Sequence, residues 1–175
     1  MLSPASIVYE TFLIPLAALI IYYDVRYRRI PNAFVLGTLV CGLSLSVVFA
    51  GLDGVLNSLG GCALAFTLMF MLHVFGAMGA GDVKLFAAIG SLMGAHLVLP
   101  TFLIVVMTGG LLALVSVVRS GAFKTTMYRV LQILVGFLPG WPMPKFAVPT
   151  DRKYTIPYGV AITIGAIIST AIFRA

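Results

Sequence analysis

Long apolar runs, each nearly free of charge, constrain this chain more than any other feature. A helix needs about 20 residues to cross the ~30 Å hydrocarbon core of a bilayer. With 61% hydrophobic and 9% charged residues, the chain has too little polar surface to cover a soluble globule. The sequence therefore predicts an all-α polytopic membrane protein with a single membrane-embedded domain. About six transmembrane helices are expected, over residues 7–23, 33–50, 57–75, 82–97, 101–118 and 155–173.

Basic residues orient this arrangement in the membrane. Three arginines follow the first run, one lysine lies at the start of the fourth, and six bases precede the last run. Cytoplasmic loops carry the excess of Lys and Arg, so we expect these loops in the cytoplasm and both termini outside. The long loop 119–153 contains a short apolar stretch, 127–137, which predicts an interfacial or re-entrant helix. The net charge of +6 is thus explained by topology, and nucleic acid is not expected as a partner.

The two cysteines indicate neither a disulfide framework nor a zinc site. Cys41 and Cys62 each lie inside an apolar run, and they do not form a Cys-x-x-Cys pair. We expect no metal and no cofactor. The first 23 residues contain Glu10 as their only charged side chain and lack the positive region of a cleavable signal, so they are interpreted as a retained first span.

A polar, glycine-rich stretch separates the third apolar run from the fourth. It contains Gly79, Gly81 and Asp82, and it sets a carboxylate between two apolar segments. Acids at membrane depth are rare, and they pair with a partner or line a functional cavity. Asp82 could simply cap a helix after a tight glycine turn. The alternative interpretation is that Asp82 is one half of a catalytic pair.

Asp24, at the end of the first run, is the expected second half. Runs two and three form a hairpin, so Asp24 and Asp82 should reach the same cytoplasmic face. A structural explanation for Asp24 is weak, because a negative charge at a helix C-terminus opposes the helix dipole. Neighbouring arginines could offset that effect by local pairing. Two acids at the same cytoplasmic face of the membrane favour a catalytic site.

Two neighbouring carboxylates are sufficient for peptide hydrolysis by an activated water. They cannot both ionise easily, so one holds a proton while the other acts as a base. From position alone, Asp82 at a helix N-terminus should be ionised and Asp24 should hold the shared proton, although the roles exchange during the cycle. Glycine at positions 79 and 81 would let an extended substrate approach the backbone closely.

Three separated segments resemble one known family. Gly79-Ala80-Gly81-Asp82 resembles the Gly-x-Gly-Asp signature of intramembrane aspartyl proteases, and residues 81–85 are similar to its type IV prepilin peptidase form. Asp24 with the following arginines and Ile30-Pro31-Asn32 is similar to that family's first catalytic segment. Ile156-Pro157-Tyr158-Gly159 is similar to its motif at the last span. The resemblance extends over essentially the whole chain.

The resemblance implies a six-helix bundle with Asp24 and Asp82 as the catalytic pair. It also implies substrate-approach and motif positions, which are Gly79, Gly81, Lys84, Pro31, Asn32, Pro157, Tyr158 and Gly159. The implied substrate is a prepilin or pseudopilin, cut beside its hydrophobic helix at the cytoplasmic face of the inner membrane. Pilus-assembly machinery and the lipid bilayer are the other implied partners, and the oligomeric state stays open.

Larger members of that family carry a cytoplasmic insertion with paired cysteines and methylate the new N-terminus. This sequence lacks such an insertion, so cleavage without N-methylation is expected. In this respect it is similar to the short peptidases of Flp/Tad pilus systems. Archaeal preflagellin peptidases are close relatives, and a substrate of that kind is an alternative.

Functions of other classes remain open at this stage. In a small proton- or ion-coupled transporter, Asp24, Asp82 and His73 would form a relay across the membrane. The external half of the sequence offers few polar groups for such a path. An inactive scaffold within a secretion complex is a third possibility. His73 could instead be a hydrogen-bonded helix residue, and Lys84 could anchor at headgroups or bias the pair toward ionisation.

Overall fold

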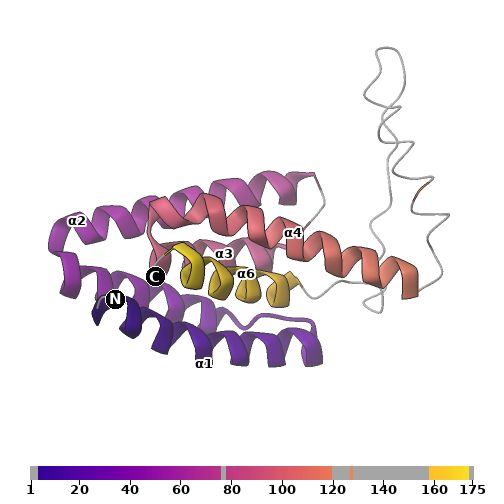
Figure 1. Cartoon of the computed structure of the whole chain (residues 1–175), viewed down its shortest axis with the longest axis horizontal. Helices are drawn as coiled ribbons and strands as arrows, with labels where there is room; N and C mark the ends of the chain where they lie inside the picture. The colour runs from indigo at the N-terminus through magenta and orange to yellow at the C-terminus, as the bar shows by residue number, and fades with distance from the viewer. Residues whose placement is uncertain (1–3, 76–77, 120–126, 128–157, 174–175) are drawn as a thin grey trace, which may run out of the picture. The chain divides into compact units, whose positions relative to one another are not determined.

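The computed structural model describes residues 4–75, 78–119, 127 and 158–173 (Figure 1). Its regular elements are all helices, as expected. They are α1 (Pro4–Tyr27), α2 (Asn32–Val74), α3 (Ala80–Met93), α4 (Ala95–Arg119) and α6 (Tyr158–Phe173). Three of them, α1, α2 and α4, are long and apolar enough to cross a membrane. Six spans and external termini stay predictions, and almost all of loop 119–153, with the expected interfacial helix, lies outside the described residues.

Helix α2 turns back on itself at Gly51. Its 43 residues are about twice the length needed for one crossing. Gly51 has φ 56° and ψ −136°, a backbone conformation that favours glycine because it has no Cβ. The second and third apolar runs of the sequence are the two limbs of this helix (Figure 1). A turn at Gly51 therefore connects the two predicted runs, 33–50 and 57–75, within one helix.

One predicted helix break was wrong. The first helix runs to Tyr27, and Asp24 lies in its last turn, at the helix C-terminus where the sequence predicted it. The break predicted between the runs 82–97 and 101–118 lies at Gly94, where φ is 81°, and Pro100 is inside α4. Proline near a helix start removes a single hydrogen bond, whereas a positive φ ends a helix with glycine at little cost. The structure therefore changes direction at Gly94.

Helix α3 packs against both limbs of α2 through small residues. A Cβ atom at Gly42, on the first limb, would lie 2.6 Å from Ser91 Oγ. On the second limb, Ala65 approaches Gly90, where an added Cβ would lie 2.6 Å from Ala65 Cβ. Small residues at such contacts let helix backbones approach closely, which is the usual basis of helix association in membranes. The close packing makes α3 the central helix.

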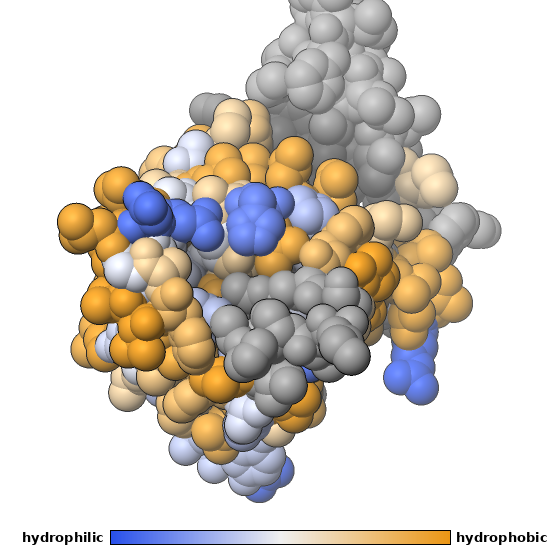
Figure 2. Space-filling view, turned by 60° about the vertical axis from the view of Figure 1, so that its left-hand side comes forward, coloured by the Kyte–Doolittle hydropathy of each residue, from blue (hydrophilic) through white to orange (hydrophobic). Residues whose placement is uncertain are grey.

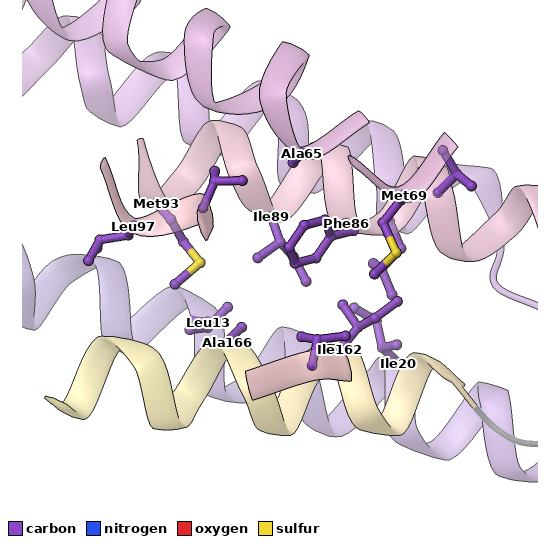
Figure 3. Packing of buried hydrophobic residues seen from close by; sticks show 14 residues of the cluster. Leu13, Ile20, Ala65, Met69, Phe86, Ile89, Met93, Leu97, Ile162 and Ala166 are labelled. Atoms are coloured by element: carbon purple, nitrogen blue, oxygen red, sulfur yellow. The ribbon is translucent and has the colours of Figure 1, made fainter. Parts of the chain in front are cut away.

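The core surrounds α3 and draws on every described helix (Figure 3). Every residue from 85 to 94 is buried, which is unusual for a helix of 14 residues. Phe86 is the largest fully buried side chain, and Met69, Ile20 and Ile162 reach the same core cluster from α2, α1 and α6. Helices α4 and α6 are joined by a hydrogen bond from Thr101 Oγ1 to Ser169 Oγ, 2.7 Å long.

The outer surface is largely apolar, as a lipid-facing surface should be. Leu52, Val48 and Met107 are each at least three-quarters exposed. Figure 2 shows one face on which hydrophobic residues predominate and hydrophilic residues are few. A water-soluble protein rarely exposes so much contiguous apolar area. Together with the three long apolar helices, this supports a membrane protein.

The end of α1 and the beginnings of α3 and α6 lie at the same end of the bundle (Figure 1). The bundle thereby places the two predicted acids at one end, since Asp24 is in the last turn of α1 and Asp82 is in the first turn of α3.

Candidate active site

Asp24 is the most buried charged side chain that the structure describes, with 7% of its surface exposed. Its carboxylate lies directly against Gly159, in the first turn of α6. A Cβ atom at Gly159 would come within 2.7 Å of Asp24 Oδ2 and 3.2 Å of Asp24 Cβ. The space that a side chain at position 159 would occupy is therefore taken by the carboxylate of Asp24.

The start of α6 also supplies hydrogen-bond donors to Asp24. The backbone amides of Gly159 and Val160 lie at the carboxylate. The first amides of a helix have no intrahelical acceptor, and the helix dipole places partial positive charge there. Asp24 is consequently under the influence of two helix ends, the C-terminus of α1 and the N-terminus of α6. Position along α1 alone no longer justifies assigning the shared proton to Asp24.

One oxygen of Asp24 remains without a partner. Oδ2 is buried and accepts no hydrogen bond from the part of the protein that the structure describes. Buried polar atoms are almost always paired, and exceptions are common where a group has a chemical role. The unpaired oxygen lies beside Gly159, on the side where α1 faces α6.

Asp82 occupies the third position of α3, not the N-cap position that the sequence suggested. Gly79 is the N-cap residue, with extended backbone angles (φ −78°, ψ 151°), and the helix begins at Ala80. The amide of Gly79 donates a 3.3 Å hydrogen bond to Asp82 Oδ2. A carboxylate at the third helical position that bonds back to the N-cap amide is a common way to close the first turn. Asp82 is half-buried.

Asp24 and Asp82 lie at the same end of the bundle, as the sequence predicted. The two carboxylates are near enough for their charges to interact. Asp82 also acts electrostatically on Tyr158, the first residue of α6. The ring of Tyr158 packs on α4 at Gly109, where a Cβ atom would lie 3.2 Å from Tyr158 Cε1. Two acids and a tyrosine from three helices therefore form one polar cluster.

The other predicted site residues lie around this cluster or apart from it. Gly81 and Lys84 are exposed on the first turns of α3, and a Cβ at Gly81 would meet no atom within 4 Å. Pro31 and Asn32 line a surface pocket at the start of α2, together with Tyr23, Tyr27, Arg29 and Ile30. Pro157 lies outside the described residues.

His73 is hydrogen-bonded, as expected of a helix histidine that has a partner. Its Nδ1 lies 2.7 Å from the carbonyl oxygen of Met78, and the side chain is half-buried. The role of Val160 was not anticipated, because a backbone amide leaves no signal in the residue type. No group of three or more His, Cys, Asp or Glu side chains suited to a metal ion occurs in the described ranges.

A helical membrane protein with two carboxylates gathered at the helix ends is the class that this structure defines. The model of the type IV leader peptidase family matches residues 11–114, and the chain belongs to that family. The matched region includes both Asp24 and Asp82, whereas α6 lies beyond it.

One curated relative of the chain has a named activity. The prepilin leader peptidase/N-methyltransferase of Legionella pneumophila is 31% identical over 114 residues. The match covers 61% of this chain and 39% of the relative, so less than half of the relative's length is represented here. No solved structure shows a significant match to the chain.

Proposed function

We propose that this protein is an aspartyl endopeptidase that removes the leader peptide of type IV prepilins. The observation that carries the proposal is that Asp24 and Asp82 lie at one end of the bundle, near enough for their charges to interact, in a chain of the type IV leader peptidase family. Membership of that family supports a peptidase over the transporter considered from the sequence. Two interacting carboxylates are the minimum that an aspartic protease mechanism requires.

The proposed reaction is attack of water on the scissile carbonyl. One carboxylate takes a proton from the water as its oxygen bonds to the carbonyl carbon, while the protonated partner donates to the carbonyl oxygen. The carboxyl that is now protonated donates its proton to the amide nitrogen, and the ionised carboxylate takes a proton from a hydroxyl of the diol as the C–N bond breaks. The leader with its new carboxyl group and the pilin with its new amino terminus are released. The pair ends with one shared proton, ready for another cycle. No covalent bond forms between the enzyme and the substrate.

The surroundings of each acid suit this chemistry. Amides of Gly159 and Val160 stabilise negative charge on Asp24, and the amide of Gly79 does so on Asp82. Because both acids have such donors, we assign the acid and base roles to the pair and not to individual residues. The unpaired Oδ2 of Asp24 is an acceptor suited to the attacking water or to the shared proton.

The glycine stretch would form the edge at which substrate arrives. Gly81 is exposed and has free space where a side chain would be, so its lack of a Cβ serves no contact within the described protein. An extended peptide could lie against this backbone. The exposed arginines at positions 26, 28 and 29 would form a basic rim that favours acidic substrate residues.

The proposed location, substrate type and absence of N-methylation are inferred from the sequence. We place the protein in the cytoplasmic (inner) membrane with the site facing the cytoplasm, because ten of the eleven bases lie on that side in the expected topology. We expect cleavage of Flp-like prepilins without N-methylation. Both cysteines of the chain lie within α2, and neither belongs to a cysteine-containing loop. Pilus-assembly proteins are proposed partners.

The test is a cleavage assay with the purified protein in lipid vesicles and a synthetic Flp-like prepilin. Mass spectrometry should show the mature pilin and the leader, and an added methyl donor should leave the new N-terminus unmethylated. Asp82→Asn should insert normally and cleave the precursor at least about a hundredfold more slowly than the wild type. An uncleaved precursor with the wild-type protein would contradict the proposal, and a proton flux across the same vesicles would favour the transporter.

A further inference from the structure

The last turn of α2 and the first turn of α3 are connected by a chain of two hydrogen bonds through one peptide group. His73 Nδ1 lies 2.7 Å from the carbonyl oxygen of Met78. The next amide, that of Gly79, donates to Asp82 Oδ2 over 3.3 Å. The carbonyl of Met78 and the amide of Gly79 belong to the same peptide unit. His73 and Asp82 therefore hold the two opposite ends of this peptide.

The direction of both bonds is determined by chemistry. A carbonyl oxygen can only accept, so His73 must carry a proton on Nδ1 and donate it to Met78. The ring is half-buried and packs near Phe70, with 6.2 Å between ring centroids, which limits its rotation. The peptide of Met78 is consequently fixed in the orientation that aims the Gly79 amide at Asp82.

A donor on the carbonyl also strengthens the amide of the same peptide. Hydrogen bonds in series polarise one another, so a bond to the Met78 oxygen makes the Gly79 N–H a better donor. The hydrogen bond from the Gly79 amide to Asp82 is long, and a long hydrogen bond depends strongly on how well its donor is aligned and polarised. We therefore infer that His73 is a positioning residue that holds Asp82 in its reactive orientation through the Met78–Gly79 peptide.

The inference rests on the proposed function, because a positioned Asp82 matters most if it takes part in catalysis. It differs from both sequence-based interpretations of His73. As a relay, the ring would exchange protons with an acid, but its Nδ1 is occupied by a carbonyl. As a purely structural residue, it would affect folding alone. A positioning role predicts an effect on Asp82 in protein that is fully folded.

Two substitutions of nearly identical shape separate these roles. His73→Asn keeps a donor attached to Cγ, at the place of Nδ1, whereas His73→Leu has the same branching and no donor. We expect His73→Leu to lower kcat for prepilin cleavage about fivefold to tenfold, the loss typical of one hydrogen bond. KM should be unchanged. His73→Asn should retain most of the activity.

A second readout does not depend on peptidase activity. Carbodiimides label protonated carboxyl groups, and mass spectrometry can follow the labelling of Asp82 in vesicles. If His73→Leu weakens the hydrogen bond from the Gly79 amide to Asp82, the ionised form of the Asp82 carboxylate loses stabilisation. Asp82 should therefore be labelled severalfold faster in His73→Leu than in the wild type, and His73→Asn should resemble the wild type. The midpoint of thermal unfolding, measured in parallel, confirms that each variant is folded.

The outcomes distinguish the inference from the proposed function. If His73→Leu and His73→Asn have equal kcat and equal labelling of Asp82, the positioning role is wrong. A difference in labelling without cleavage of prepilin by the wild type would retain the positioning role and reject the peptidase. Faster labelling of every carboxyl group, together with a lower unfolding temperature, would show a structural residue only.

Discussion

Asp24 and Asp82 reach the same site by different means. Asp24 is buried, and its surroundings come from α6, a segment far away in the sequence. Asp82 is half-buried, and its hydrogen bond comes from Gly79, three residues earlier. The orientation of Asp82 thus depends on the short stretch of chain from His73, at the end of α2, to the start of α3. That of Asp24 depends on how two helices distant in the sequence pack. Substitutions at the two sides of the pair should reveal this difference.

The largest effect should come from removing either acid. Asp24→Asn and Asp82→Asn should each lower kcat by about a hundredfold to ten-thousandfold, the usual contribution of acid–base groups. Both should do so equally, because the pair shares one proton. Single-turnover cleavage of prepilin in vesicles would measure the loss. Substantial activity in one of the two variants would mean that the acids do not act as a pair.

The next largest effect is expected at Gly159. In Gly159→Ala the new Cβ would lie 2.7 Å from Asp24 Oδ2, so the carboxylate must turn away. A misplaced catalytic group can cost about a hundredfold in rate. We expect a loss of kcat of about tenfold to a hundredfold, with KM nearly constant. Gly37→Ala in α2, which meets nothing within 4 Å, is the matched control and should be fully active. Equal rates for both variants would show that Gly159 does not position Asp24.

A moderate effect is expected where α3 packs on α2. In Gly90→Ala the added Cβ would lie 2.6 Å from both Ala65 Cβ and the carbonyl oxygen of Gly61. Overpacking of this kind costs about 1–3 kcal/mol. Thermal unfolding in detergent should therefore occur at a lower temperature, and kcat should fall severalfold because Asp82 begins the same helix. Gly60→Ala, whose Cβ would lie 3.7 Å from Ala95, should change neither quantity. An unaltered unfolding temperature for Gly90→Ala would contradict the tight contact.

The smallest effect should appear at Gly81. A Cβ there meets no atom within 4 Å, so Gly81→Ala should leave the free energy of unfolding unchanged or raise it by up to about 1 kcal/mol. The unfolding temperature should accordingly be unchanged or slightly higher. If substrate lies against this turn, KM should rise about threefold for Ala and further for Gly81→Val. A KM that does not depend on side-chain size would place the substrate elsewhere.

Much of the fold was predictable because hydrophobicity is a local property. Apolar runs predicted the helical membrane class and the reversal of the chain between 50 and 57, now seen at Gly51. The helix end at Gly94 was not predictable. It depends on a positive φ, which residue types alone do not report.

The sequence by itself determined the class of the protein, the identity of the two acids and the glycine stretch beside one of them. These are features of composition and of short motifs, so they need no knowledge of which segments touch. Only the tertiary structure decided why position 159 is glycine, which amides serve Asp24, and that His73 reaches the peptide before Gly79. Steric fit and hydrogen-bond direction between distant segments exist only once the helices have packed.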